Sequence, residues 1–347
     1  MDDFEQSYQD DYNYTYDNGT PPEEAVPVFK HNSKCFKEAS CVILLVASVV
    51  IFLLGVCGNA LVIWISGFKM KKTVNTTWYL SLAISDFIFC AFLPFSIANT
   101  VMEEWIFGLI MCKFISSMMF LNMFSSIFLL VIISVDRCVS VMFPVWAQNT
   151  RTVSKASVAV VLAWLFSIAL CIPSAIFRVV DSHLGKTSCF NNYTLHEHSQ
   201  MIVTVSRFIV GFVVPFFIII ICYSVIIIKL RTNRMTNSSK PFKVMTALIL
   251  VFFICWLPYH VFVLLELNYQ LYDRHILTNG LKMGPTLAAA NSFLNPVLYV
   301  FMGNDFRQKF KSSLLSKMEN AMGDEGRTTS RYLSRSSSMD GRASTHI

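Results

Sequence analysis

The chain has 347 residues, of which 54% are hydrophobic and only 14% are charged. Soluble domains carry about a quarter charged residues, so this composition indicates a membrane protein. The net charge of +6 does not point to a nucleic-acid binder, because the basic residues lie in short segments between apolar stretches, where they set membrane orientation.

Seven apolar stretches follow one another, each about as long as the roughly 20 residues that cross a bilayer as a helix. A helix satisfies its own backbone hydrogen bonds, which lipid cannot do. The sequence therefore predicts an all-α membrane protein with a seven-transmembrane helix bundle over residues 39–302. The predicted spans are Ala39–Ile65, Thr76–Val101, Ile110–Phe143, Ser154–Phe177, Met201–Lys229, Val244–Leu267 and Met283–Met302.

Basic residues are concentrated in the first, third and fifth connections, whereas the second carries Glu103 and Glu104. Loops rich in Lys and Arg face the cytoplasm. We therefore expect a multi-pass plasma-membrane protein with an extracellular N-terminus and a cytoplasmic C-terminus. Residues 1–38 would form an acidic, glycosylated outer tail, and they show no cleavable signal peptide. Glycosylation sequons on the predicted outer side begin at Asn13, Asn18 and Asn192.

Most of the ten cysteines lie within the spans, where Cys usually packs as a small hydrophobe. Cys112 heads the third span and Cys189 lies in the second outer loop. An oxidising exterior favours a disulfide between these two. Cys35 and Cys41, close to the first span, can pair with each other or stay free.

The third span ends with Asp136 and Arg137 at its inner face. An adjacent acid and base can form an ion pair that holds the span closed, and breaking the pair would free Arg137 for a cytoplasmic partner. The alternative is an Arg that extends from the helix end toward water and has no further role.

The sixth span places Phe252 and Trp256 just before Pro258. Proline removes a backbone donor and bends the helix. A bulky ring beside that hinge is a candidate lever, although core packing explains the Trp equally well.

Several polar side chains lie inside the spans, where they are costly and by default functional. Near the inner end of the seventh span, Asn295 and Pro296 precede Tyr299. We expect a buried polar cluster that suits water and a small cation such as sodium, since an unpaired buried carboxylate would be costly. No other cofactor and no protein metal site is expected. The cluster comprises Asp86, Asn122, Ser126, Asn291 and Asn295, with Asn59 nearby.

Residues 303–318 place apolar residues at helical spacing among Lys and Arg, which predicts a short amphipathic eighth helix on the anionic inner leaflet. Residues 319–347 predict a disordered cytoplasmic tail rich in Ser, Thr and Arg. Its hydroxyl groups beside arginines are typical of kinase substrates whose phosphates dock a basic partner. The candidate sites are Thr328, Thr329, Ser330, Ser334, Ser336, Ser337 and Ser338.

In their order along the chain, these motifs resemble the rhodopsin-like (class A) G-protein-coupled receptors. The resemblance covers roughly residues 42–310 and includes Leu82-Ala83-Ile84-Ser85-Asp86 and Trp164. It implies coupling to a heterotrimeric G protein, and arrestin and receptor kinases as further partners. The activation-switch residues it implies are Asp136, Arg137, Tyr223, Phe252, Trp256, Pro258, Asn295, Pro296 and Tyr299.

The loops narrow the resemblance to the chemerin receptors, in the branch shared with formyl-peptide and complement anaphylatoxin receptors. It implies a chemoattractant peptide or protein ligand, most similar to chemerin, and signalling through inhibitory-class G proteins and arrestin in chemotaxis and inflammation. The segments that carry it are Gly67–Asn75, Pro144–Asn149, Gly185–Asn192, Lys240–Lys243, Leu264–Leu267 and Tyr299–Gly303.

In this family the ligand's C-terminal carboxylate and aromatic residues enter an outer pocket. Arg178 and Arg207, at the outer ends of the fourth and fifth spans, can grip a carboxylate bidentately, and Arg207 is the expected anchor. Glu266 ends the sixth span. Phe120 stands where formyl-peptide receptors place an acid, which disfavours that ligand. The alternative is an Arg207–Glu266 or Arg178–Asp181 ion pair with no ligand role.

Other functions stay open. A chemerin-scavenging, arrestin-biased receptor shares this fold, although Asp136, Arg137 and Tyr299 favour G-protein coupling. A formyl-peptide, anaphylatoxin or lipid-mediator receptor is a further alternative. A transporter is the least favoured, because paired repeats with matching broken helices are not evident. An enzyme is not expected, since the sequence shows neither metal-ligand spacing nor a nucleophile–base constellation.

Overall fold

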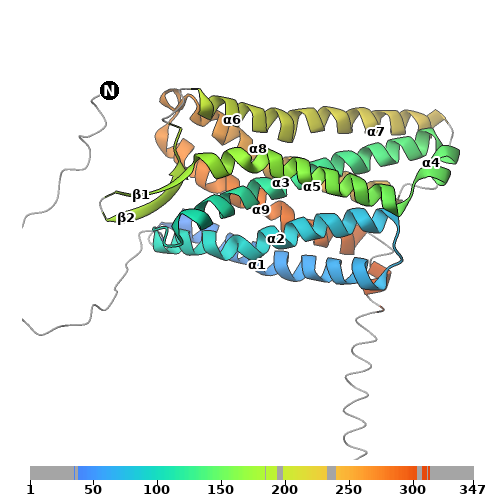
Figure 1. The fold of residues 1–347 in the computed structure, drawn as a ribbon, viewed down its shortest axis with the longest axis horizontal. Helices are drawn as coiled ribbons and strands as arrows, with labels where there is room; N and C mark the ends of the chain where they lie inside the picture. The colour runs from blue at the N-terminus through green and yellow to red at the C-terminus, as the bar shows by residue number, and fades with distance from the viewer. Residues whose placement is uncertain are drawn as a thin grey trace, which may run out of the picture. The chain divides into compact units, whose positions relative to one another are not determined.

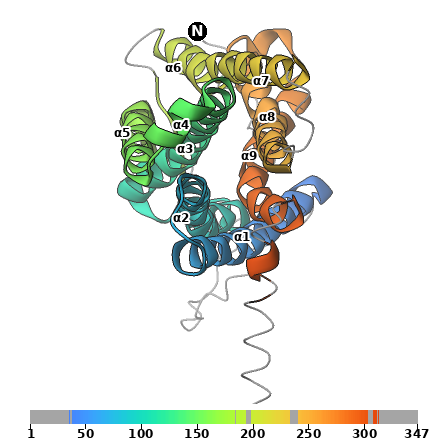
Figure 2. The ribbon, with the colours of Figure 1, turned by 90° about the vertical axis from the view of Figure 1, so that its right-hand side faces the viewer.

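The computed structural model describes Cys35 and residues 38–183, 185–193, 198–232, 240–302, 307–310 and 312. The described residues belong to one helical unit, in which long helices run side by side (Figure 1) and form a ring when viewed along their axes (Figure 2). Its long helices are α1 (Ala39–Trp64), α2 (Val74–Met102), α3 (Gly108–Met142), α5 (Val153–Phe177), α6 (Ser199–Phe208), α7 (Val214–Thr232), α8 (Lys240–Glu266) and α9 (Arg274–Met302).

Two spans contain π-helical turns. Ile65–Lys69 extends α1, and Ile209–Val213 joins α6 to α7 into one span. Within the described residues, six helical spans are long and apolar enough to cross a membrane. The seventh, α9, is less apolar because it carries Asn291, Asn295 and two prolines, and it packs against α1, α2 and α8. The predicted seven-transmembrane helix bundle is therefore confirmed.

The seventh helix begins at Arg274, well before the predicted Met283. Asp273 explains the early start, because its Oδ1 accepts hydrogen bonds from the backbone N–H groups of His275 (2.9 Å) and Ile276 (3.0 Å). This side chain caps the helix in a polar stretch that hydropathy alone does not mark as helical.

Two loop elements were not predicted. A short helix, α4 (Pro144–Thr150), follows α3 and has its proline at the first position, where no backbone N–H is needed. The second outer loop forms an antiparallel hairpin of β1 (Arg178–His183) and β2 (Lys186–Asn191). Gly185 permits the tight turn because its φ is +75°.

The core surrounds α3, whose buried side chains include Phe124 and Ile127, and continues through Phe252 and Trp256 of α8. In its most apolar segment 61% of α3 is buried, against 11% of α1, so α3 is central and α1 peripheral. Even α1 approaches its neighbours closely at Gly55, where an added Cβ would collide with Cys90 Sγ. The core thus fixes α3 as the helix on which residues from the other spans converge.

Of the predicted eighth helix, residues 307–310 are helical, and most of 303–318 lies outside the described residues. The predicted tails over 1–34 and 319–347 also lie outside them, and with them Asn13, Asn18 and every candidate phosphorylation site.

Candidate functional site

Arg207 lies in the last turn of α6 and is 9% exposed. Its Nη2 donates a hydrogen bond to Ser174 Oγ of α5 at 2.7 Å. Its guanidinium carbon lies 3.8 Å from the ring centroid of Phe120, a cation–π contact. Its buried Nε has no hydrogen-bond partner among the described residues. The α3, α5 and α6 helices therefore hold this cation against an aromatic face and leave a donor unused.

Arg178 is the first residue of β1, and its Nη1 donates to the backbone carbonyl of Cys189 at 3.2 Å. The Cys112–Cys189 disulfide ties β2 to the top of α3, so it also positions this contact. Burial lowers the pKa of the Arg178 guanidinium from its ordinary value, and the charge of Arg207 acts in the same direction. Two mutually repelling cations are thus held within electrostatic range of each other.

Neither alternative ion pair is present. Arg207 does not bridge to Glu266 and Arg178 does not bridge to Asp181, and no other described carboxylate pairs with either guanidinium. Glu266 ends α8, where it lies partly buried. A buried cation without a counterion is costly, so this arrangement favours an external anion.

Aromatic rings connect the two arginines to the core. Phe120 contacts Tyr259 at a centroid distance of 6.2 Å, and Tyr259 contacts Trp256 at 5.7 Å. Trp256 stacks on Phe252 at 6.0 Å. His260 packs on the Tyr259 ring at 5.4 Å, and its buried Nε2 has no partner within the described part of the chain. Tyr259 is therefore in ring contact with both Phe120 and Trp256.

Three residues of the predicted polar cluster, Asp86, Asn122 and Asn295, meet inside the bundle. Asp86 is fully buried, and its two carboxylate oxygens accept from Asn122 Nδ2 (2.9 Å) and Asn295 Nδ2 (2.8 Å). The buried Ser126 Oγ and both amide atoms of Asn291 have no partner within the described part of the chain. This set of oxygen ligands fits a small hard cation with water.

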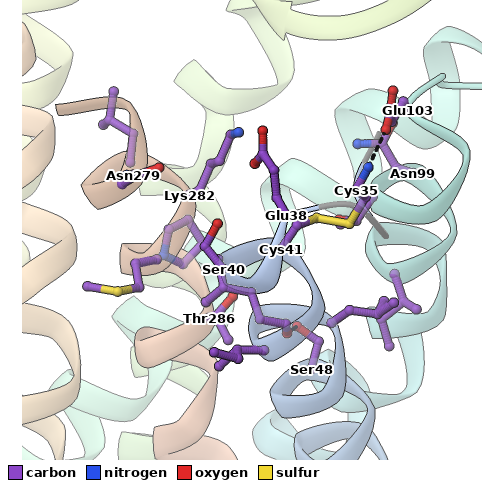
Figure 3. A pocket seen from close by; sticks show the side chains of 18 residues that line it. Cys35, Glu38, Ser40, Cys41, Ser48, Asn99, Glu103, Asn279, Lys282 and Thr286 are labelled. Carbon is purple, nitrogen blue, oxygen red and sulfur yellow. Dashed lines mark hydrogen bonds between the residues drawn. A yellow bond between two sulfur atoms is a disulfide. The ribbon is translucent and has the colours of Figure 1, made fainter. Parts of the chain in front are cut away.

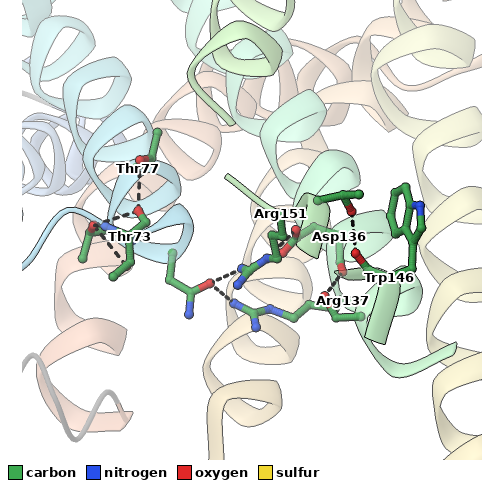
Figure 4. Close-up of polar contacts among 10 residues, drawn as sticks. Thr73, Thr77, Asp136, Arg137, Trp146 and Arg151 are labelled. Atoms are coloured by element: carbon green, nitrogen blue, oxygen red, sulfur yellow. Dashed lines mark hydrogen bonds and ion pairs between the residues drawn. The ribbon is translucent and has the colours of Figure 1, made fainter. Parts of the chain in front are cut away.

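At the inner end, Asp136 pairs with Arg151 rather than with its neighbour Arg137 (Figure 4). Arg151 Nε and Nη2 donate to the two carboxylate oxygens at 2.8 and 2.9 Å. Arg151 Nη2 also donates to Asn75 Oδ1 at 2.6 Å, and Arg137 donates to the same oxygen. The Asp136–Arg137 pair predicted from the sequence is therefore replaced by a four-residue network across α2, α3 and the start of α5.

Neither Arg151 nor Asn75 was predicted as a site residue, and Arg151 counted only among the basic residues of the third connection. A local signal existed, because Arg151 directly precedes Thr152, whose side chain accepts from Lys155 N and starts α5.

Two further predicted switch residues are tyrosines. Tyr299 is 2% exposed with its ring 4.9 Å from Tyr79, and Tyr223 lies within electrostatic range of Arg137.

The disulfide Cys112–Cys189 is confirmed. Of the two states left open for Cys35 and Cys41, the structure has the disulfide. Asn192 follows β2, and its backbone N–H donates to Phe177 O at 2.8 Å. Its glycosylation stays a prediction.

These features together define a seven-helix receptor with an anion-seeking outer cluster and a charged inner network. Residues 58–299 match the model of the 7 transmembrane receptor (rhodopsin family), and the chain belongs to this family. That membership also confirms that the protein is a receptor rather than an enzyme or a transporter, and that it crosses the plasma membrane several times.

Among curated proteins, the chain is similar to Chemerin-like receptor 1 of Sus scrofa, with 42% identity over 94% of this chain and 92% of the relative. It is 43% identical to Chemerin-like receptor 1 of Homo sapiens over 92% of this chain and 88% of the relative. Formyl peptide receptor-related sequence 6 of Mus musculus is 40% identical over 82% of this chain and 88% of the relative.

Proposed function

We propose that this receptor binds a chemoattractant peptide or protein of the chemerin type through its C-terminal carboxylate. The observation that carries the proposal is the cluster of Arg207 and Arg178, two guanidinium groups with no carboxylate partner in the described chain. Arginine grips a carboxylate with two parallel hydrogen bonds, and the free Nε of each side chain is a ready donor. Phe120 and Tyr259 supply aromatic contacts beside them.

The proposed orientation places this cluster outside the cell. The Cys112–Cys189 disulfide ties α3 to β2, which pairs with the strand that Arg178 begins. Cys35, bonded to Cys41, donates to Glu103, which pairs with Lys186 of β2, so both disulfides lie at the end of the bundle that carries the arginine cluster. Disulfides persist in the oxidising exterior, which supports an extracellular N-terminus and glycosylation at Asn192. The opposite end, with Asp136 and Arg151, then faces the cytoplasm.

Signalling is proposed to run through inhibitory-class G proteins, with receptor kinases and arrestin acting on the C-terminal tail. Ligand contact with Phe120 and Tyr259 would shift Trp256 beside the Pro258 hinge, as the series of ring contacts suggests. Movement of α8 would then free Arg137 to meet the G protein. The cluster around Asp86 is proposed to bind sodium in the resting receptor.

The test uses cells that express the receptor and a synthetic peptide of the chemerin C-terminus. G-protein activation and arrestin recruitment are recorded in parallel over a full range of peptide concentrations. We expect both responses. A C-terminally amidated peptide is the matched control, since it removes only the carboxylate that the two arginines are proposed to bind.

The other outcomes are equally informative. Arrestin recruitment without G-protein activation would favour a scavenging receptor. A response to formylated peptides but not to the chemerin peptide would move the receptor to the formyl-peptide group, which is 40% identical. Silence in both assays, with the receptor present at the cell surface, would overturn the chemerin assignment.

A further inference from the structure

A cavity of about 800 Å³ lies apart from the arginine cluster, between the first turns of α1, the C-terminal end of α2 and the first turns of α9 (Figure 3). Cys35 and residues from 38–48, 97–103 and 279–286 contribute its lining, which includes neither Arg207 nor Arg178. Its volume lies within the roughly 300–1,000 Å³ range of small-ligand sites. The cavity is therefore large enough to hold a separate ligand.

The lower wall of the cavity is apolar and reaches the outer surface of the bundle. Ile43, Leu44, Ile97 and Met283 line it, and Ile43 and Met283 are 66% and 42% exposed. In a membrane this surface faces hydrocarbon, because α1 is the least buried of the spans. An acyl chain can therefore enter sideways between α1 and α9.

The rim of the cavity carries two exposed charges that no described residue neutralises. Glu38 and Lys282 both point into the cavity in Figure 3, and neither has a side-chain hydrogen bond or ion pair within the described residues. They do not pair with each other either. Glu103 differs, because its Oε1 accepts from Cys35 N at 2.8 Å and its Oε2 lies 3.6 Å from Lys186 Nζ.

We propose that this cavity binds a single-chain zwitterionic amphiphile of the lysophospholipid type. The phosphate would contact Lys282, the terminal ammonium would contact Glu38, and the acyl chain would lie along Ile43, Leu44 and Met283. A zwitterionic head fits better than a purely anionic one, because one carboxylate and one ammonium stand unpaired on the same rim. The assignment of the head group to the outer leaflet rests on the orientation proposed above.

The experiment uses the purified full-length receptor in nanodiscs with photoreactive lysophosphatidylcholine as the probe. We expect saturable labelling of peptides from α1 and α9 that unlabelled lysophosphatidylcholine competes away. Glu38→Gln and Lys282→Gln should each weaken probe affinity about threefold to fivefold, the size of an exposed ion pair. Ser48→Phe, which fills the apolar part of the cavity, should weaken it about tenfold or more.

Arg274→Gln is the matched control, because it removes an exposed cation from the same helix outside the cavity lining. It should leave labelling unchanged. Lysophosphatidic acid, which has the phosphate but no ammonium, should compete less well with the wild type, and Glu38→Gln should abolish that difference. Equal competition by both lipids in the wild type would overturn the zwitterionic assignment.

Labelling that does not saturate, or that all three cavity variants leave unchanged, would show partition into the bilayer and overturn the site. The responses of the Glu38→Gln and Lys282→Gln receptors to the chemerin peptide show whether a failure belongs to this proposal or to the proposed function. The site stands if these variants lose lipid affinity, whether or not the chemerin peptide activates the wild type. Epitope tags at the two termini test the orientation independently.

Discussion

The arginine side chains at the two ends of the bundle have different kinds of partner. At the outer end, the partners of Arg207 and Arg178 among the described residues are a hydroxyl, a backbone carbonyl and the Phe120 ring beside Arg207. At the inner end, Arg151 is bound by both carboxylate oxygens of Asp136, and Arg137 and Arg151 share the Asn75 oxygen. Both ends contain paired guanidinium groups, but in the described part of the chain the inner end alone supplies a carboxylate to them.

This difference assigns the two ends different tasks. A partly buried cation without a counterion leaves its desolvation cost uncompensated, and an incoming carboxylate recovers that cost on binding. A cation already paired inside the chain resists movement, so the inner network stabilises one arrangement of α2, α3 and α5. The arrangement at the outer end favours binding of an incoming carboxylate. The arrangement at the inner end keeps its arginines paired until the helices move.

Removing the outer anchor should have the largest effect. Arg207→Ala should lower peptide potency about 30-fold or more, because truncating one partner of a buried, hydrogen-bonded charge pair costs about 2–5 kcal/mol. Concentration–response curves for G-protein activation measure it, with surface expression recorded by antibody. Arg207→Lys keeps the charge without the bidentate fork and should fall in between. Unchanged potency in Arg207→Ala would remove the anchor role.

A double-mutant cycle tests directly whether Arg207 contacts the C-terminal carboxylate of the peptide. Amidating the peptide's C-terminus should cost about tenfold or more in potency at the wild type and nearly nothing further at Arg207→Ala, since contacting groups are not additive. The control peptide carries a change far from its C-terminus. Full additivity would show that the carboxylate binds elsewhere, and Arg178→Ala in the same cycle would then identify the second guanidinium as its partner.

Breaking the inner network should raise signalling without ligand. Arg151→Ala removes the paired contact that ties Asp136 of α3 to the connection between α4 and α5, so basal G-protein activation should rise about tenfold, the effect of a charge-assisted hydrogen-bonded contact. Basal nucleotide exchange on the G protein in membranes measures it. Lys155→Gln, on an exposed lysine of the same helix start, should change nothing. A basal rate equal to that of the wild type would refute the holding role.

The residues at the outer end were predicted from the sequence more completely than those at the inner end. Arg207 and Arg178 were predicted as a ligand site because they are cations at the ends of spans, and Phe120 was added through the resemblance to the formyl-peptide receptors. Ser174 and His260 were not predicted. A polar side chain inside a span is a general sign of function, but only packing shows that Ser174 meets Arg207 and that His260 packs on Tyr259.

At the inner end the dipeptide Asp136–Arg137 suggested its own pair. Adjacent residues on a helix point about 100° apart, however, so they do not face each other. Arg151 reaches Asp136 only because α4 turns the chain back, and no periodicity predicts such a turn. The helices themselves were predicted within a few residues wherever apolar sequence defines them, and least well at Arg274, where a cap rather than hydropathy starts the helix.

The polar cluster between the two ends gives the smallest effect and tests whether the ends are coupled. If sodium binds the Asp86 carboxylate, replacing sodium by choline should raise peptide affinity about fivefold, a modest allosteric coupling, and Asp86→Asn should abolish the difference. Potassium is the matched ion, because it holds ionic strength constant while fitting a compact oxygen site less well. The Asp86→Asn substitution keeps the side-chain volume, but the new amide could accept from only one of Asn122 and Asn295, so surface expression must be checked. A sodium effect of equal size in Asp86→Asn would place the ion elsewhere and would leave the outer and inner arginines connected only by the aromatic contacts through Trp256.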